Sequence, residues 1–186
     1  GQVEKDLKAI QNTMLNDYTV KKRTVGKGVL DKATAYELGA AGPTLRASGW
    51  AQDARQLRYA AFDELDFEPV VESAGDSYAR GAVRFRETLQ SIDLVRQAID
   101  KLPAGEINAR VKGFPEGEMV ARVEQPRGEL LYYMKCDGSK HLDRLRIRTP
   151  TFANIAPLLA MLPGCQLADV PVIVLSIDPC ISCTER

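Results

Sequence analysis

The sequence predicts an α+β fold that is mostly helical and carries one small antiparallel sheet. Apolar residues recur at steps of three and four along residues 3–16 and 76–101, which is the period of an amphipathic helix. Between residues 117 and 148, runs rich in β-branched and aromatic residues alternate with turn residues. The 186 residues, 45% of them apolar, suffice for one core, and we expect the helix at 76–101 to be its spine.

Charge and hydropathy argue against nucleic-acid binding and against a membrane span. Lys plus Arg and Asp plus Glu each number 25, and the zero net charge provides no electrostatic basis for binding nucleic acid. No apolar run reaches the roughly 18 residues that a span requires. The first residues show no secretory signal, so the four cysteines predict a reducing compartment.

Two helices are predicted before residue 40. The first covers 3–16, and the basic triplet Lys21–Arg23 that follows is typical of a solvated turn, with contact to an acidic partner as the less favoured alternative. Asp31 is a suitable N-cap for a short helix through Leu38, which Gly39 closes.

The middle of the chain predicts two loops and the long helix. The glycine-bounded segment 42–49 lacks phosphate-loop spacing and is expected to be a functional loop, while the acidic segment 63–68 is expected to be a solvated turn. Along 76–101 one continuous apolar stripe predicts a core-facing surface. Three arginines near its start are expected to be solvated: Arg80, Arg84 and Arg86.

Three short strands and another helix follow. The strands are expected at Met119–Val123, Leu130–Met134 and Leu145–Arg148, with His141 on the surface in the second turn. A helix is expected over residues 151–162, with Thr151 as its cap.

The chain ends in a Cys-x-x-Cys pair, Cys180 and Cys183, after an apolar run at 170–177. The run is expected to be buried, as strand or helix, and to deliver the thiols from the interior. The spacing suits a soft metal, a zinc half-site or a redox dithiol. A redox pair depends on a following helix, for which only 181–186 remain, and a zinc site needs two further ligands that are not paired at metal spacing.

The segment Asp178-Pro179-Cys180-x-x-Cys183-x-x-Arg186 resembles the C-terminal signature of the large subunit of nickel-iron hydrogenases. Four further blocks, at 42–49, 75–80, 124–129 and 147–154, resemble the membrane-bound, energy-converting branch, in particular the carbon-monoxide-induced and Ech-type large subunits. The same blocks resemble the 49-kDa subunit of respiratory complex I. That subunit lacks the metal cysteines, so the terminal pair favours a hydrogenase.

The resemblance implies a role for each residue of the motif. Cys180 is similar to a terminal nickel ligand, and Cys183 to a thiolate that bridges nickel and iron. Arg127 is similar to the arginine that overhangs the metals, and Asp178 to its carboxylate partner.

Pro150 and Thr151 resemble the pair that packs against the carbonyl and cyanide ligands of the iron, with the hydroxyl donating a hydrogen bond. The implied cofactor is a nickel-iron centre with carbon monoxide and cyanide ligands, held by four cysteines. A second Cys-x-x-Cys is missing here, since Cys136 and Cys165 are far apart in the sequence. We therefore expect residues 1–186 to be the C-terminal part of a large subunit and, alone, to be metal-free and inactive.

The resemblance also implies partners: an iron–sulfur small subunit, membrane subunits, and H₂ with protons as reactants. It implies a peripheral position on the cytoplasmic face of a membrane. Two alternatives stay open at this point, namely a complex I-like quinone-reductase subunit and a non-catalytic domain that binds zinc or serves assembly.

Overall fold

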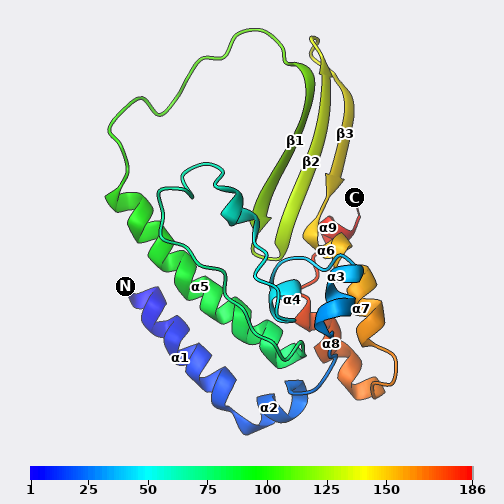
Figure 1. The fold of residues 1–186 in the computed structure, drawn as a ribbon. Coiled ribbons are helices and arrows are strands. Elements are labelled where there is room, and N and C mark those ends of the chain that lie inside the picture. The colour runs from blue at the N-terminus through cyan, green and yellow to red at the C-terminus, as the bar shows by residue number, and fades with distance from the viewer. Residues whose placement is uncertain (186) are drawn as a thin grey trace.

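The computed structural model describes residues 1–185, which form a helical body from which one sheet projects (Figure 1). The spine is α5, Ser77–Asp100, as predicted. Asp76 caps it by accepting a hydrogen bond from the Ala79 N–H, and its other carboxylate oxygen accepts one from the Gly26 N–H, at 2.8 Å each. The cap therefore both starts the helix and attaches the preceding chain to it.

Short helices lead into the spine. They are α1 (Gln2–Asn16), α2 (Tyr18–Thr24), α3 (Lys32–Glu37), α4 (Pro43–Arg46) and the 3₁₀ turn η1 (Ala54–Leu57). The helix over 3–16 and the Asp31 cap are confirmed. The prediction of a solvated turn at Lys21–Arg23 is wrong, because Asp17 caps a helix there and the triplet lies in the last turn of that helix. The loop at 42–49 likewise contains α4.

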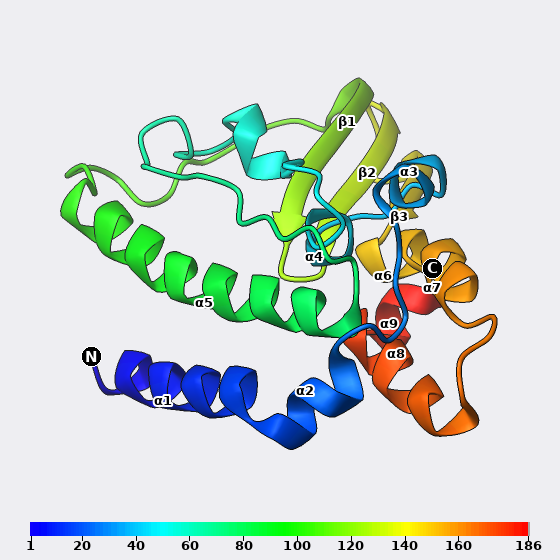
Figure 2. The same cartoon turned by 60° about the horizontal axis from the view of Figure 1, so that its bottom comes forward.

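The buried face of α5 differs from the predicted stripe. Arg80 and Val83 are completely buried, whereas Val95 and Ile99 are 58% and 66% exposed. Arg84 was also expected to be solvated, yet its Nε and Nη2 atoms are inaccessible to solvent. The reason is that α4 and α8 pack on the first half of α5, while α1 lies alongside it (Figure 2). Arg86 is exposed, as expected.

The predicted antiparallel sheet is confirmed and its strands are longer than expected. Strand β1 (Glu116–Gln125) pairs with β2 (Gly128–Asp137), which pairs with β3 (Leu142–Arg148). Gln125 is opposite Gly128, so Pro126 and Arg127 form a two-residue turn at the end of the sheet nearest the helical body. His141 is exposed at the other end, as predicted.

The C-terminal segment contains α6 (Pro150–Ala153), α7 (Ile155–Met161), η2 (Leu167–Asp169), α8 (Val170–Ser176) and α9 (Ile181–Thr184). The single helix expected over 151–162 is broken at Asn154, and its cap is Thr149, not Thr151. The apolar run at 170–177 is helical and only partly buried, since Ile173 and Ile177 are inaccessible while Leu175 is 70% exposed.

The core lies between these C-terminal helices and α3–α4. Its buried members are Leu30, Ala35, Ala40, Leu45, Leu158, Met161, Ile173 and Ile177. Because α8 contributes Ile173 and its C-cap residue is Ile177, the terminal Cys-x-x-Cys closely follows a core element. Within residues 1–185, no helix combines the length and hydropathy that crossing a bilayer would require.

Candidate metal centre

The chain reverses direction just before the two cysteines. Ile177 is buried in the core, and Asp178 adopts a left-handed conformation with φ of 55°. Aspartate tolerates this region better than most residues, and Pro179 then prevents the helix from continuing. The reversal ends α8 and begins α9 at Cys180, which is its N-cap residue.

Helix α6 fastens this turn from the side. The Cys180 N–H donates to the Thr151 hydroxyl oxygen at 3.3 Å, and the Thr149 hydroxyl donates to the Cys183 carbonyl. Thr149 and Thr151 are both buried, as is Pro150 between them. The structure therefore brings the predicted residues Pro150 and Thr151 to the cysteine pair, and it adds Thr149, which sequence reasoning missed.

The two thiols have different acidities. The pKa of Cys180 is lowered to about 7, mainly by the Ser182 hydroxyl at 3.1 Å and then by the Cys183 N–H. Burial raises the pKa of Cys183, and the neighbouring Cys180 adds to that. The positive charge of Arg127 lowers the pKa of both thiols. A deprotonated sulfur is the form that binds a metal.

Arg127 and Asp178 are paired, as the sequence predicted. The Arg127 Nε donates to the Asp178 carbonyl at 2.9 Å and lies 3.3 Å from its carboxylate. The position of Arg127 is set by close backbone packing, because a Cβ on Gly42 would lie 2.3 Å from the Gly128 Cα. Only glycine fits such an approach. Loop 41–42 and the hairpin turn therefore touch directly.

Asn154 hydrogen-bonds to the same loop, at Ala41. Its side-chain amide accepts a hydrogen bond from the Ala41 N–H at 2.9 Å and donates one to the Ala41 carbonyl at 3.2 Å, completely buried. Asn154 is the last residue of the block at 147–154, yet the sequence assigned it no role. Its position at the end of that block was the only feature of the sequence that could have pointed to this role.

Two arginines of α5 secure the end of α8. Arg80 Nε donates to the Ser176 hydroxyl at 2.8 Å, and Arg84 Nη1 donates to the Ser176 carbonyl at 2.6 Å. Burial lowers the pKa of each to about 10. Ser176 lies two residues before Asp178, so α5 positions the reversal that presents the cysteines.

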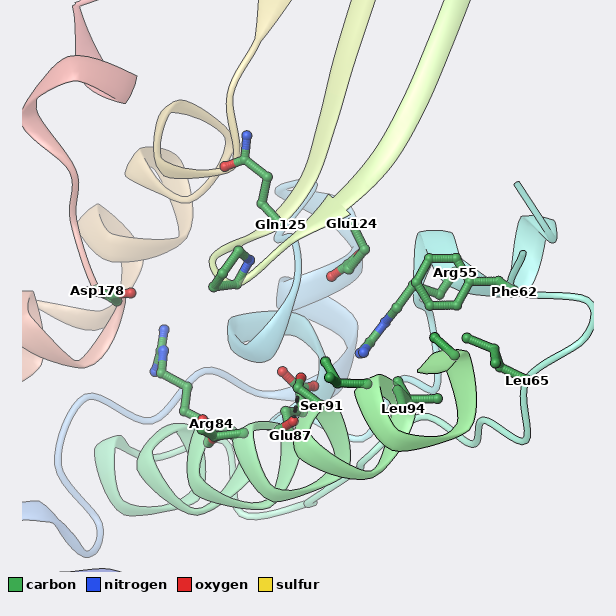
Figure 3. Close-up of a pocket in the computed structure, with 14 residues that line it drawn as sticks. Arg55, Phe62, Leu65, Arg84, Glu87, Ser91, Leu94, Glu124, Gln125 and Asp178 are labelled. Carbon is green, nitrogen blue, oxygen red and sulfur yellow. Dashed lines mark hydrogen bonds between the residues drawn. The ribbon is translucent and has the colours of Figure 1, made fainter. Parts of the chain in front are cut away.

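A cavity of about 690 Å³ opens next to this site, between α5 and the β1–β2 turn (Figure 3). Phe62, Leu65 and Leu94 line one end of it. Arg84 and Asp178 mark the other end, where Arg84 points from α5 toward the turn. The cavity thus connects an apolar region with the surroundings of the Arg127–Asp178 pair.

The donors that the described residues supply amount to one thiol pair. Within residues 1–185, no three His, Cys, Asp or Glu side chains gather as a metal site would require. Cys136 is buried in β2, and Cys165 packs beside the core after α7. Two soft donors beside an arginine fit half of a four-thiolate nickel-iron centre.

A family model confirms the relationship that these motifs indicated. The model for the 49 Kd subunit of respiratory-chain NADH dehydrogenase matches residues 1–114 and 110–186. The chain belongs to this family. Among curated relatives, the carbon monoxide-induced hydrogenase of Rhodospirillum rubrum is 43% identical over 192 residues, which is 100% of this chain and 53% of the relative.

Other relatives fall into both expected groups. The alpha subunit of the membrane-bound hydrogenase of Pyrococcus furiosus is 38% identical, over 97% of this chain and 46% of the relative. An NADH-quinone oxidoreductase subunit of Roseiflexus sp. is 40% identical, over 84% of this chain and 45% of the relative. The chain thus spans about half the length of these relatives.

A solved structure confirms the fold. A chain of the membrane-bound sulfane sulfur reductase, described as an archaeal respiratory membrane complex, superposes with a TM-score of 0.92 at 36% identity. The match covers 100% of this chain and 52% of that one. The α+β architecture is therefore that of the 49-kDa family.

Proposed function

We propose that this chain is part of the catalytic large subunit of a membrane-bound, energy-converting nickel-iron hydrogenase. The observation that carries the proposal is the anchored pair Cys180 and Cys183, presented beside the Arg127–Asp178 ion pair. Three separate attachments, from α5, α6 and the hairpin turn, hold the segment that presents the pair. The hydrogenases among the relatives support this assignment.

Cys180 and Cys183 would hold the nickel-iron centre in this proposal. When bound, such a centre supplies reversible heterolytic splitting of H₂. Arg127 contributes a fixed positive charge next to anionic ligands, and its bond to Asp178 keeps the guanidinium in place. Pro150 and Thr151 lie buried beside the cysteine pair, where the Thr151 hydroxyl accepts from the Cys180 N–H and keeps its own proton to donate.

The rest of the parent protein would complete the centre. This chain offers two thiolates, and we propose that a second Cys-x-x-Cys outside residues 1–186 supplies the others, so that the chain alone is metal-free and inactive. By the same reasoning, electrons pass to an iron–sulfur small subunit, and membrane subunits couple the reaction to ion movement. The names of the relatives support a peripheral place in a membrane-bound complex, which we assign to the cytoplasmic face.

Infrared spectroscopy of the full-length complex tests the proposal. Metal-bound carbonyl and cyanide absorb in a window where protein does not, and we expect sharp bands there. Cys183→Ser should abolish them, whereas Cys165→Ser, a cysteine on another segment, should retain them. A folded complex without such bands would overturn the assignment.

The complex I-like subunits among the relatives favour a second candidate, a quinone-reductase-type subunit. That function needs no metal at Cys180. A Cys180→Ala complex that retains full turnover would favour it, and loss of turnover would favour the hydrogenase.

A further inference from the structure

A cluster of largely buried charged side chains lies near the β1–β2 turn. Arg46 is completely buried, and its Nε is 2.6 Å from Glu87 Oε1. Its Nη1 is 2.9 Å from Glu124 Oε1 and 3.1 Å from Asp53 Oδ2. Arg55 is the second cation, 2.7 Å from Asp53. Two guanidinium groups thus face three carboxylates, and Arg84 is a third cation close to Glu87.

Glu124 is a buried carboxylate of this cluster with a raised pKa. Its side chain is 4% exposed, and desolvation raises its pKa although Arg46 and the Ala54 N–H at 2.9 Å oppose the shift. The charge of Asp53 raises it further. Arg84, the next cation along the cavity, acts mainly on Asp178 and Glu87.

Glu124 also stands between two cavities. It lines the cavity of about 690 Å³ that reaches Asp178, together with Glu87 (Figure 3). It also lines a second cavity of about 200 Å³, whose other polar residues include Glu129 and Arg148. No other described residue lines both cavities.

The second cavity leads outward. The Glu129 carboxylate pairs with Arg148 and with Arg122, whose side chains are 36% and 41% exposed. Each cavity therefore has a carboxylate of its own, Asp178 in the larger and Glu129 in the smaller, and Glu124 lines both.

We propose that Glu124 relays protons between the two cavities, linking the region of the Arg127–Asp178 pair with the surface at Glu129. A proton donor in the larger cavity, a water or hydronium, loses one O–H bond as the Glu124 carboxylate gains one. The carboxyl then releases that proton to water or to the Glu129 carboxylate on the side of the smaller cavity. The step consumes nothing, and it rests on the proposed function because H₂ chemistry requires proton exchange with solvent.

The groups that face Glu124 set the conditions for this step. They come from α4, η1 and the residues that flank it, α5 and the smaller cavity: Arg46, Asp53, Arg55, Tyr59, Glu87, Glu129 and Arg148. If Glu124 had only a structural role, it would stay paired with Arg46 and never take up a proton. Proton uptake by Glu124 therefore distinguishes a relay from a structural role.

The first measurement is infrared titration of the full-length complex in the region of protonated carboxylic acids. We expect a band that appears as the pH falls and that is missing in Glu124→Gln. Glu118→Gln is the matched control, because Glu118 is an exposed carboxylate on the same strand. If no band depends on Glu124 over the pH range in which the complex stays folded, the relay is overturned.

The second measurement compares two isotope reactions of the complex. Exchange of D₂ with solvent protons requires proton transfer out of the site, whereas interconversion of para- and ortho-H₂ requires only cleavage at the metal. We expect Glu124→Gln to slow the exchange roughly 100-fold and to leave the interconversion unchanged. Glu124→Asp, which keeps a titratable group, should recover part of the exchange.

Equal losses in both reactions, or no loss in either, would overturn the relay. Absence of metal carbonyl and cyanide bands would overturn the proposed function instead. The carboxyl titration would still decide whether Glu124 takes up a proton, so the two failures are distinguishable.

Discussion

The two halves of α5 differ in what they bury, although both belong to one continuous helix. In the first half, Arg80 and Val83 are inaccessible to solvent, so a cation and an apolar residue are buried together. In the second half, Val95 and Ile99 carry the predicted apolar stripe but remain mostly exposed. Burial along α5 therefore follows the elements that pack on it, α4 and α8, and not the apolar pattern of the helix itself.

The two halves of α5 also differ in their contacts with the candidate site. Every contact from α5 to the cysteine turn or to the buried cluster comes from the first half, through Arg80, Arg84 and Glu87. The second half makes peripheral bonds, such as those between Gln97 and the backbone of Asp66. The first half is thus the rigid base of the candidate site.

Of the substitutions that test this comparison, Arg80→Met should have the largest effect on stability. Arg80 donates to the Gly75 carbonyl at 2.7 Å and to the buried Gly28 carbonyl at 2.9 Å. The substitution would remove both bonds, and within residues 1–185 only the Gly75 carbonyl keeps another donor, the Leu30 N–H. We expect a loss on the order of 4 kcal/mol in the free energy of unfolding, measured by chemical denaturation.

Arg86→Met is the control for that variant. Arg86 is a neighbouring arginine whose exposed ion pair with Glu72 should contribute less than about 1 kcal/mol. Similar losses in both variants would show that the first half of α5 is no more sensitive than an exposed site.

Val83→Ala and Val95→Ala form the next test, with the same deletion in each half. Val83 is completely buried, so removing two methyl groups should cost about 2 kcal/mol through lost burial and a small cavity. Val95 is 58% exposed and should cost less than about 0.5 kcal/mol. Equal shifts of the urea denaturation midpoint in the two variants would contradict the difference in burial between the two halves of α5.

Glu4→Gln should show a smaller, pH-dependent effect on the second half. Arg96 of α5 and Lys8 lower the pKa of Glu4 from an ordinary 4.5 to about 2. Because this folded-state pKa is below the unfolded one, the stabilisation is present above about pH 4.5 and is lost as the pH falls toward 2.

Thermal unfolding followed by circular dichroism should therefore separate wild type from Glu4→Gln near neutrality and bring them together in acid. A separation that stays constant down to pH 2 would show that Glu4 does not act through its charge.

Ile99→Lys should have the smallest effect. Ile99 is 66% exposed near the end of α5, so a charged residue there displaces no packing, and we expect the denaturation midpoint of this chain to be unchanged. A clear loss of stability would show that the apolar stripe contributes to the core after all.

Local patterns predicted much of this fold. Helical periodicity located the first helix and α5, and turn residues separated the three strands, because these signals depend on neighbouring residues alone. Caps were less predictable. Thr149 caps α6 in place of the expected Thr151, whose hydroxyl accepts from Cys180, and both threonines suit a cap when the sequence is considered alone.

The candidate site was likewise predictable only in part from the sequence. The spacing of Cys180 and Cys183, with Asp178 before them, identified the family and the predicted ligands without coordinates, and a family model then confirmed the relationship. Arg84 escaped that reasoning, since an arginine on a helix is usually solvated. It is buried because the end of α8 packs over it and supplies the Ser176 carbonyl as an acceptor.

The sequence by itself determined the candidate ligands and the family, since ligand type and spacing along the chain are local properties. The tertiary structure alone decided where they meet. The backbone contact of Gly42 with Gly128, the burial of Arg46 among three carboxylates, and the position of Glu124 between two cavities each join segments far apart in the chain. Such contacts depend on how whole elements pack, which no periodicity within a single element encodes.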